Sequence, residues 1–253
     1  MNKNLILLLS IVAFAGCGSS SSDEKKIDIS GYLPSTSMSK AYTHVTKIDG
    51  KLNNRPYTDT VVVESSLVSI KEDGKLSRLI TVKADEIEIK YLNDVNHSKV
   101  MTRNLAEGDN ISNYLKKDEV ETLKIGSQKI GEKHTRVEEK CVLDSMINRY
   151  EKFFFEYTNY DDKHNIMKIK CTTKTVVETK IDAQYVDSVS YTNGIVESKE
   201  DFSYIYLQKD LGTIATINDD CLASKLPDVI DDTLEPEKCL GERYTYDLYQ
   251  PQY

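Results

Sequence analysis

The stretch Glu86-Ile-Glu-Ile-Lys-Tyr91 decides the fold class of this chain, because charged and apolar side chains alternate along it without interruption. Successive side chains of an extended chain point to opposite faces. Its two isoleucines and its tyrosine therefore share one face, and its charged residues share the other. The same period of two returns in Arg243-Tyr-Thr-Tyr-Asp-Leu248, close to the end of the 253 residues. Both stretches predict antiparallel strands with one buried face.

Short turn signals separate the candidate strands. Asp49-Gly50, Asp73-Gly74 and Asn193-Gly194 favour two-residue hairpin turns, because both turn residues adopt positive φ there. A further turn is expected at 161–163. Two short helices are expected, near 110–117 and near 220–226. Runs rich in β-branched residues and tyrosine give strand candidates at 41–48, 57–63, 66–72, 76–83, 86–92, 98–104, 119–125, 134–143, 147–159, 166–180, 184–192, 195–200, 202–208, 213–218 and 243–249.

Many consecutive strands joined by short turns predict a mainly β domain. We expect an antiparallel meander that forms a curved sheet or a partly open barrel, with one or two short helices. A transmembrane barrel is the competing interpretation, and it requires strands with a continuous lipid-facing apolar set. Thr135-Arg-Val-Glu-Glu-Lys140 places charges on both faces of its strand, so we reject the transmembrane barrel.

The beginning of the chain carries the pattern of an export signal. Lys3 supplies a positive charge, and Leu5 to Ala15 is a largely apolar run of 11 residues. That length suits a signal peptide and falls short of the ~20 residues that a spanning helix needs. Ala15 and Gly16 are the small residues that precede a cleavage site. Residues 1–16 are therefore predicted to be a cleaved signal.

The segment Phe14-Ala-Gly-Cys17 resembles the lipobox of bacterial lipoproteins, although Leu is commoner at the place of Phe14. The resemblance implies that Cys17 becomes the N-terminus and carries a diacylglyceryl thioether and an N-acyl chain. Two or more such chains hold a protein stably in a membrane. Gly18, in place of Asp, implies the outer membrane facing the periplasm, with the cell surface as the alternative. An ordinary signal peptide with a chance cysteine is the competing interpretation.

Composition and charge divide and characterise the mature chain. Residues 17–40 are rich in Ser and show no apolar period, so they are predicted to form a lipidated flexible tether. Residues 41–253 then form a single β-rich domain. The formal net charge is −8, and removal of Lys3 with the signal leaves −9. This balance argues against nucleic acid as a partner, because such binding needs clustered positive charge.

Four cysteines follow Cys17, and an even number in an exported chain predicts two disulfides. Of the three connectivities we favour Cys141 with Cys171, across a predicted hairpin, and Cys221 with Cys239, around an irregular segment near 218–242. Each closure is worth ~3 kcal/mol. The chain has no CxxC spacing, so we expect neither a metal site nor a cofactor. Four free thiols are the alternative in a reducing compartment.

Aromatic side chains offer a candidate apolar groove. Tyrosine is abundant, with 16 residues against five phenylalanines, so aromatic faces here carry hydroxyl groups. Core packing is the plain interpretation of the densest clusters. The functional interpretation is an apolar groove rimmed by hydroxyls, which would suit a lipid or a peptide. Its candidate residues are Phe153, Phe155, Phe202, Tyr204 and Tyr206.

The stretch Phe202-Ser-Tyr-Ile-Tyr-Leu-Gln-Lys-Asp-Leu-Gly-Thr-Ile-Ala-Thr-Ile217 predicts a strand, a Gly-containing turn and a second strand. It resembles the late hairpin of curved antiparallel half-barrel envelope proteins, the lipoprotein-carrier (LolA/LolB-like) group. The resemblance implies a concave sheet able to shelter acyl chains or a partner. The chain departs from that group because it has no tryptophan and no predicted helical lid.

Catalytic motifs are missing from the sequence. It has no HExxH, GxSxG or Walker A pattern, and its acidic stretches lack the glycine and terminal glutamate of a calcium loop. We therefore expect a non-catalytic, membrane-anchored envelope lipoprotein with a protein-interaction or structural role. The alternative is a lipid- or small apolar ligand-binding half-barrel in the periplasm. The four histidines form no cluster in the sequence, so we expect them to be surface residues: His44, His97, His134 and His164.

Overall fold

The computed structural model describes most of the chain: residues 25–48, 51–92, 98–111, 116–147, 166–182, 194–218 and 244–250. Within these ranges no helix is long and apolar enough to cross a membrane. The predicted lipidation site Cys17 and the groove candidates Phe153 and Phe155 lie outside them, as does the predicted Cys221–Cys239 pair.

Among the described residues, one antiparallel sheet of 13 strands dominates the structure, and a two-stranded sheet accompanies it. The mainly β prediction is confirmed. The small sheet pairs β1 (Ile27–Asp28) with β8 (Asn104–Leu105), and the 3₁₀ helix η1 (Ile29–Tyr32) follows β1 directly. The large sheet contains β2 (Met38–Ile48), β3 (Lys51–Glu64), β4 (Leu67–Glu72), β5 (Lys75–Val82), β6 (Glu86–Tyr91), β7 (Ser98–Thr102), β9 (Asn110–Ile111), β10 (Lys116–Ile125), β11 (Gln128–Ile147), β12 (Ile166–Ile181), β13 (Gly194–Gln208), β14 (Gly212–Ile217) and β15 (Tyr244–Gln250).

The strand order follows the chain in two meanders. The sheet runs β10-β11-β12-β13-β14-β15-β2-β3-β4-β5-β6-β7, so the last strand of the chain pairs with the first long one. The β15–β2 ladder extends from Tyr244 opposite Lys47 to Gln250 opposite Ala41. This long-range pairing joins the two meanders into one continuous surface.

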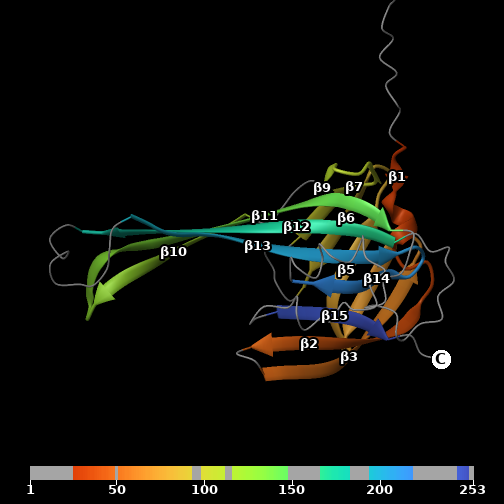
Figure 1. Ribbon diagram of the computed structural model, residues 1–253, viewed down its shortest axis with the longest axis horizontal. Helices are drawn as coiled ribbons and strands as arrows, with labels where there is room; N and C mark the ends of the chain where they lie inside the picture. Colours follow the sequence, from red (N-terminus) through yellow and green to blue (C-terminus); the bar gives the residue numbers. More distant parts are fainter. Residues whose placement is uncertain are drawn as a thin grey trace, which may run out of the picture.

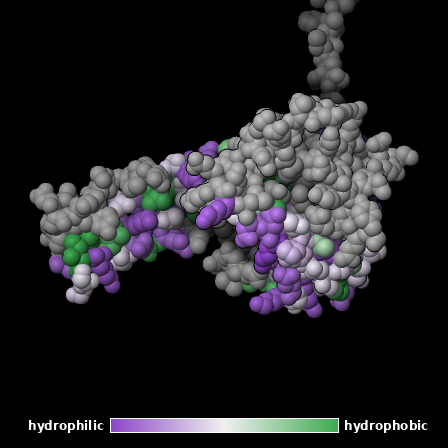
Figure 2. All heavy atoms as spheres, turned by 60° about the horizontal axis from the view of Figure 1, so that its bottom comes forward, coloured by the Kyte–Doolittle hydropathy of each residue, from purple (hydrophilic) through white to green (hydrophobic). Residues whose placement is uncertain are grey.

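Strands β11 to β13 extend beyond the rest of the sheet and, together with β10, form an arm (Figure 1). We define the arm as residues 116–138, 174–181 and 194–200, which pair with one another in register. Fully buried side chains of β11 and β12 concentrate at the other end of these strands, for example at Leu143 and Met167. The arm buries Ile130 and Ile181 (1% and 7% exposed) but also carries two exposed apolar residues, Val120 (55% exposed) and Ile125 (48%). Figure 2 shows an apolar area near its end.

Outside the arm the sheet curls, so that β7 approaches the part of β11 that follows residue 138. We call the gap between these two strands the seam. No ladder joins β7 to β11 among the described strands, so the sheet is not closed into a barrel. Other contacts bridge the seam. The Lys99 ammonium on β7 lies 2.7 Å from a Glu139 carboxylate oxygen on β11. Leu143 exchanges backbone hydrogen bonds with Gly108 and Asp109, at 2.6 and 3.1 Å.

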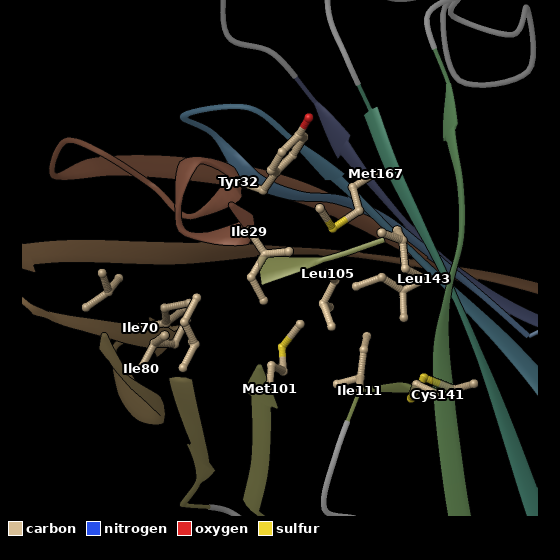
Figure 3. Close-up of a cluster of buried hydrophobic side chains, with 14 of the residues drawn as sticks. Ile29, Tyr32, Ile70, Ile80, Met101, Leu105, Ile111, Cys141, Leu143 and Met167 are labelled. Atoms are coloured by element: carbon tan, nitrogen blue, oxygen red, sulfur yellow. A yellow bond between two sulfur atoms is a disulfide. The ribbon is translucent and has the colours of Figure 1, made fainter. Parts of the chain in front are cut away.

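A single apolar cluster fills the concave side of the curled sheet. Figure 3 shows Ile29 of η1 among side chains of the strands, including Ile70, Met101 and Leu105. Each of these residues is at most 7% exposed. Burial of a large aliphatic side chain contributes about 1.5–3 kcal/mol. The cluster therefore ties β4, β7 and the N-terminal segment to β11 and β12.

The predicted helix near 110–117 is wrong at both of its described ends. Asn110 and Ile111 form β9, which pairs with Val142 and Cys141 of β11, and Lys116 begins β10. Ile111 is 2% exposed and joins the apolar cluster. Its ladder bonds and its burial outweigh a weak local helix preference, as tertiary contacts often do. The second predicted helix, near 220–226, lies outside the described residues.

The tether prediction is wrong for residues 27–40. We call residues 27–35 the cap, because Ile29 and Tyr32 of η1 enter the apolar cluster at 2% and 6% exposure. Asp28 begins the helix, and its side chain accepts a hydrogen bond from the Ser30 N–H at 2.9 Å. Arg103 binds the same carboxylate at 3.2 Å. The average composition of this segment is polar. Its few apolar residues order it only because they pack against the sheet.

The structure joins Cys141 and Cys171 in a disulfide, which is the pairing predicted for them. The two residues face each other directly across the β11–β12 ladder, with Cα atoms 3.9 Å apart. Both are at most 1% exposed. The bond therefore fixes the register of the two strands that run from the core into the arm. The pairing of Cys221 with Cys239 stays a prediction.

Two hairpin turns show why the sheet needs glycine at particular places. The predicted Asp73-Gly74 turn joins β4 to β5, and both residues have positive φ, 45° and 81°. Gly212 also has a φ of 81°, at the start of β14. A Cβ atom on Gly74 would meet open space, whereas one on Gly212 would lie 2.9 Å from Cδ of Pro34 in the cap. Gly212 is therefore also a contact point between the cap and the sheet.

We predict that Gly212→Ala destabilises the chain more than Gly74→Ala does. Both substitutions place an alanine at the same positive φ, which costs about 1–2 kcal/mol. Only Gly212→Ala adds the clash with Pro34, which should cost a further 1–3 kcal/mol, roughly the range for an overpacked core. Guanidinium unfolding of the two variants and the wild type measures this difference. Equal losses would show that the cap does not press on this turn.

Candidate functional site

The curled sheet and the cap enclose a cavity of about 220 Å³. Most of one side of its wall is apolar, because the inner residues of β4 to β7 meet those of β11 to β13 across it. Lys99 of β7, paired with Glu139, is a charged residue on this side. The cap residues Leu33 and Pro34 cover one side. The apolar wall consists of Ile70, Ile80, Ile87, Ile89, Met101, Ile111, Cys141, Ile169, Ile205 and Leu207, with Ile29 and Tyr32 from the cap.

Strand alternation builds this wall. In the predicted strand β6, Ile87 pairs with Met101 of β7, and Ile89 pairs with Ile80 of β5. Directly opposed residues of neighbouring strands share a face, so these side chains all point inward. The alternation that predicted the fold class therefore also places the cavity-lining residues of this half of the sheet.

Backbone hydrogen bonds hold the cap over the cavity. The Ile29 N–H donates to the Arg103 carbonyl at 2.9 Å, beyond the end of β7. At the other end of the cap, the Asp210 N–H donates to the Gly31 carbonyl at 2.9 Å, and the Ser35 N–H donates to the Asp210 carbonyl at 3.1 Å. The cap thus connects the β7–β8 region with the β13–β14 turn and covers the space between them.

The other part of the wall is polar, and we call it the polar end: Lys40, Tyr42, Asp59 and Arg78. Lys40 on β2 stands directly opposite Asp59 on β3, so their side chains share the inner face. Lys40, Tyr42 and Asp59 are 2%, 4% and 3% exposed. Charged groups at this depth are costly unless they are paired or hydrogen-bonded. Their presence marks a place where the core departs from ordinary apolar packing.

Lys40 and Tyr42 reach from β2 to backbone carbonyls at the start of β14. The Lys40 ammonium donates to the Leu211 carbonyl at 3.1 Å and to the Thr213 carbonyl. The Tyr42 hydroxyl donates to the Thr213 carbonyl at 2.7 Å. The ammonium also lies 5.1 and 5.3 Å from the ring centres of Tyr42 and Tyr249, within range of a cation–π contact. These contacts fix the direction of the Lys40 side chain.

Asp59 is only half satisfied. Arg78 donates to its Oδ2 atom at 2.6 Å, and this pair links β3 to β5. The Oδ1 atom is buried and has no hydrogen-bond partner among the described residues. Burial raises the pKa of Asp59, although Arg78 and Lys40 oppose that shift. A buried acceptor without a donor costs about 1–3 kcal/mol, so this oxygen calls for a partner inside the cavity.

The groove predicted from aromatic residues lies on the wrong face of β13. Phe202, Tyr204 and Tyr206 point to the convex side, where Lys170 lies 4.4 Å from the Phe202 ring and Lys168 lies 4.8 Å from the Tyr204 ring. The residues between them, Ile205 and Leu207, are the ones that line the cavity. Tyr204 and Tyr206 are nonetheless buried, at 4% and 1% exposure. Their aromatic density reflects packing on the convex face, as the plain interpretation held.

Sequence reasoning did not single out the residues of the polar end. Lys40 and Asp59 each lie between inward-facing residues, with Met38 and Tyr42 flanking Lys40 at a spacing of two. A charged residue on the apolar side of an alternating strand is the signal that would have found them. Single strands could not show it, because the face that each residue occupies depends on which strands pair. The two described histidines have separate partners: His44 binds Asp247 at 2.8 Å and His134 binds Glu132 at 3.3 Å. His97 and His164 lie outside the described residues.

Comparison of the chain with protein-family models, with curated proteins and with solved structures finds no match. The cavity and its polar end are therefore the features of the chain that bear on its function.

We predict that Lys40 makes the stability of the chain rise with pH. Burial lowers the pKa of Lys40 to about 7 from its usual 10.5, although the Asp59 carboxylate favours the charged form. The unfolded chain keeps this proton up to pH ~10.5 whereas the folded chain releases it near 7, so folding is favoured as pH rises between these values. The slope is at most ~1.4 kcal/mol per pH unit.

Urea unfolding at pH ~7.5 and ~9.5 measures this rise, which we expect to be about 2 kcal/mol in the wild type. Lys40→Met removes the titrating group and should abolish the rise. Lys71→Met alters an exposed lysine of β4 and should retain it. Parallel pH profiles for the wild type and Lys40→Met would contradict the assignment.

Proposed function

We propose that this chain is a lipid-anchored envelope protein that binds a small apolar molecule inside its curled sheet. The observation that carries the proposal is the capped cavity, with a mostly apolar wall on one side, where Lys99 is paired with Glu139, and a cluster of charged groups on the other. Binding sites for small molecules are typically concave and mostly apolar, with a few polar groups that orient the ligand. The absence of catalytic motifs from the sequence fits binding better than catalysis.

The size of the cavity sets the class of ligand. An engineered apolar cavity of ~150 Å³ already binds benzene, and this one is larger at about 220 Å³. It suits a short acyl chain or a small ring system. Transfer of each CH₂ group from water to such a wall contributes about 0.8 kcal/mol. The concave antiparallel sheet is consistent with the half-barrel expectation drawn from the 202–217 hairpin.

The proposed anchor lies close to the cap in sequence. About ten residues separate Cys17 from Ile27, the first residue of β1. A fully extended segment of that length spans at most ~35 Å. A lipid on Cys17 would therefore keep the cap, and the cavity beneath it, near the membrane surface. This favours a ligand that comes from or goes to the membrane.

A protein-binding role is the second candidate function, and the arm favours it. Val120 and Ile125 are exposed on β10, the end strand of the large sheet. Exposed edge strands can pair with another chain, although charged residues such as Glu119 and Glu121 oppose this on β10. The extraction experiment described below separates this role from ligand binding.

We predict that the wild-type chain fractionates with membranes and incorporates labelled palmitate when it is produced in a bacterial host. Cys17→Ser removes the acylated thiol, so the label should be lost. Ser19→Ala changes a neighbouring residue and should behave as the wild type. Labelled palmitate on the Cys17→Ser chain would rule out lipidation at this residue.

We predict that filling the cavity expels the bound molecule. Solvent extraction of the purified full chain, followed by mass spectrometry, should yield a small apolar compound in stoichiometric amount. Ile80→Phe adds bulk to the apolar wall and should lower its occupancy about tenfold, which corresponds to ~1.4 kcal/mol. Ile125→Phe makes the same change on the exposed arm and should leave occupancy unchanged.

Ile89→Phe is a second variant of the apolar wall, in case Ile80→Phe does not fold, and the circular dichroism of each variant checks folding. Identical extracts from the wild type and the folded wall variants would mean that the cavity is merely core. In that case the arm would become the favoured functional feature.

A further inference from the structure

We propose that the cavity selects a neutral apolar molecule that carries a hydroxyl group, and that Asp59 and Lys40 hold this hydroxyl at the polar end. The inference rests on the proposed function and specifies the chemical class of its ligand. It stands on a buried acceptor that lines the cavity and has no partner among the described residues, on the ammonium opposite it, and on the apolar wall that completes the space.

Asp59 offers a ligand a buried hydrogen-bond acceptor. Its Oδ1 atom is buried and lacks a hydrogen-bond partner among the described residues, while its Oδ2 atom accepts from Arg78 at 2.6 Å. The side chain is 3% exposed, so bulk water does not reach it freely. Nothing in an apolar hydrocarbon can satisfy this oxygen. A ligand O–H group can, because it donates one hydrogen bond without bringing a charge.

Lys40 supplies the complementary donor. In its charged form, which the folded chain holds below its pKa of about 7, Lys40 has three N–H bonds, and two of them go to the carbonyls of Leu211 and Thr213. Lys40 and Asp59 face each other across the β2–β3 ladder on the inner face. A ligand hydroxyl placed between them accepts a hydrogen bond from the third N–H of Lys40, and its own O–H donates a hydrogen bond to Oδ1 of Asp59. One neutral group thus satisfies both side chains.

Charged head groups fit less well. A ligand carboxylate would bring a second negative charge against the unpaired oxygen of Asp59, and it has no proton to donate. A ligand ammonium could donate to Asp59, but it would stand beside the cations Lys40 and Arg78. Either ion would also lose its hydration in a largely apolar cavity, which is costly without full pairing. The hydroxyl avoids both penalties.

Four probes with the same chain length test this inference: 1-octanol, octyl methyl ether, octanoate and octylamine. Equilibrium dialysis against the full chain in lipid nanodiscs at pH ~6, below the Lys40 pKa of about 7, measures binding, with empty nanodiscs as the blank. The ether keeps an acceptor oxygen but lacks a donor, so it cannot satisfy Asp59. We expect 1-octanol to bind about tenfold more tightly than the ether, the cost of one unsatisfied buried acceptor.

Asp59→Asn should replace the free acceptor of the site with a hydrogen-bond donor. The Arg78 N–H requires an oxygen, so the amide turns its NH₂ group toward the place of the free Oδ1 atom and donates to the ligand. The preference for 1-octanol over the ether should then fall to about onefold or below. Retained binding of the ether shows that the variant still has its cavity. Asp85→Asn changes an exposed aspartate and should keep the wild-type preference.

The outcomes separate this inference from the proposed function. Binding of none of the probes by the wild type would overturn the proposed function and this inference with it. Equal binding of 1-octanol and the ether would overturn the hydroxyl assignment alone. Tighter binding of octanoate or octylamine would overturn it in favour of a charged head group. If Asp59→Asn no longer binds the ether, the hydroxyl assignment is decided by the preference of the wild type for 1-octanol over the ether.

Discussion

The pairing of β15 with β2 is the constraint on which the rest of the structure depends. It joins residues about 200 positions apart, Ala41 with Gln250 at one end and Lys47 with Tyr244 at the other. Without it the sheet would separate into the β2–β7 meander and the β10–β14 meander, each with an unpaired edge. Loop closure over this distance is entropically expensive but grows slowly with length, and the ladder and the shared core offset it. With the pairing in place, the two inner faces form one concave surface (Figure 1).

The same pairing creates the polar end. It brings Lys40 and Tyr42 of β2 close enough to β14 to donate to the carbonyls of Leu211 and Thr213, past the ring of Tyr249 on β15. The β14–β15 ladder ends at the pair Ala215 and Leu248. The bonds from Lys40 and Tyr42 hold the two meanders together beyond that end. The cost is a buried lysine with a lowered pKa and a carboxylate with one oxygen that has no partner in the described part of the chain. Natural chains usually break local rules of packing where function requires it.

The local structure of much of the chain could be predicted because local signals agreed with the tertiary fold. The alternation in Glu86–Tyr91 became β6, and the Asp73-Gly74 signal became a hairpin turn with positive φ at both residues. The hairpin of 202–217 and the pairing of Cys141 with Cys171 are also present as predicted. The cap was misread, because Ile29 and Tyr32 are too sparse to show a period and gain their meaning only against the sheet.

The sequence by itself determined the antiparallel β class, the turns and which residues of each strand share a face, because these depend on alternation and on φ preferences of neighbouring residues. Only the tertiary structure decided which face is concave. That choice placed Ile205 and Leu207 at the cavity, turned Tyr204 and Tyr206 away from it, and set Lys40 against Asp59. The physical reason is that a strand alternates between two faces of equal geometry, and only its partners, some of them about 200 residues away, determine which face is enclosed.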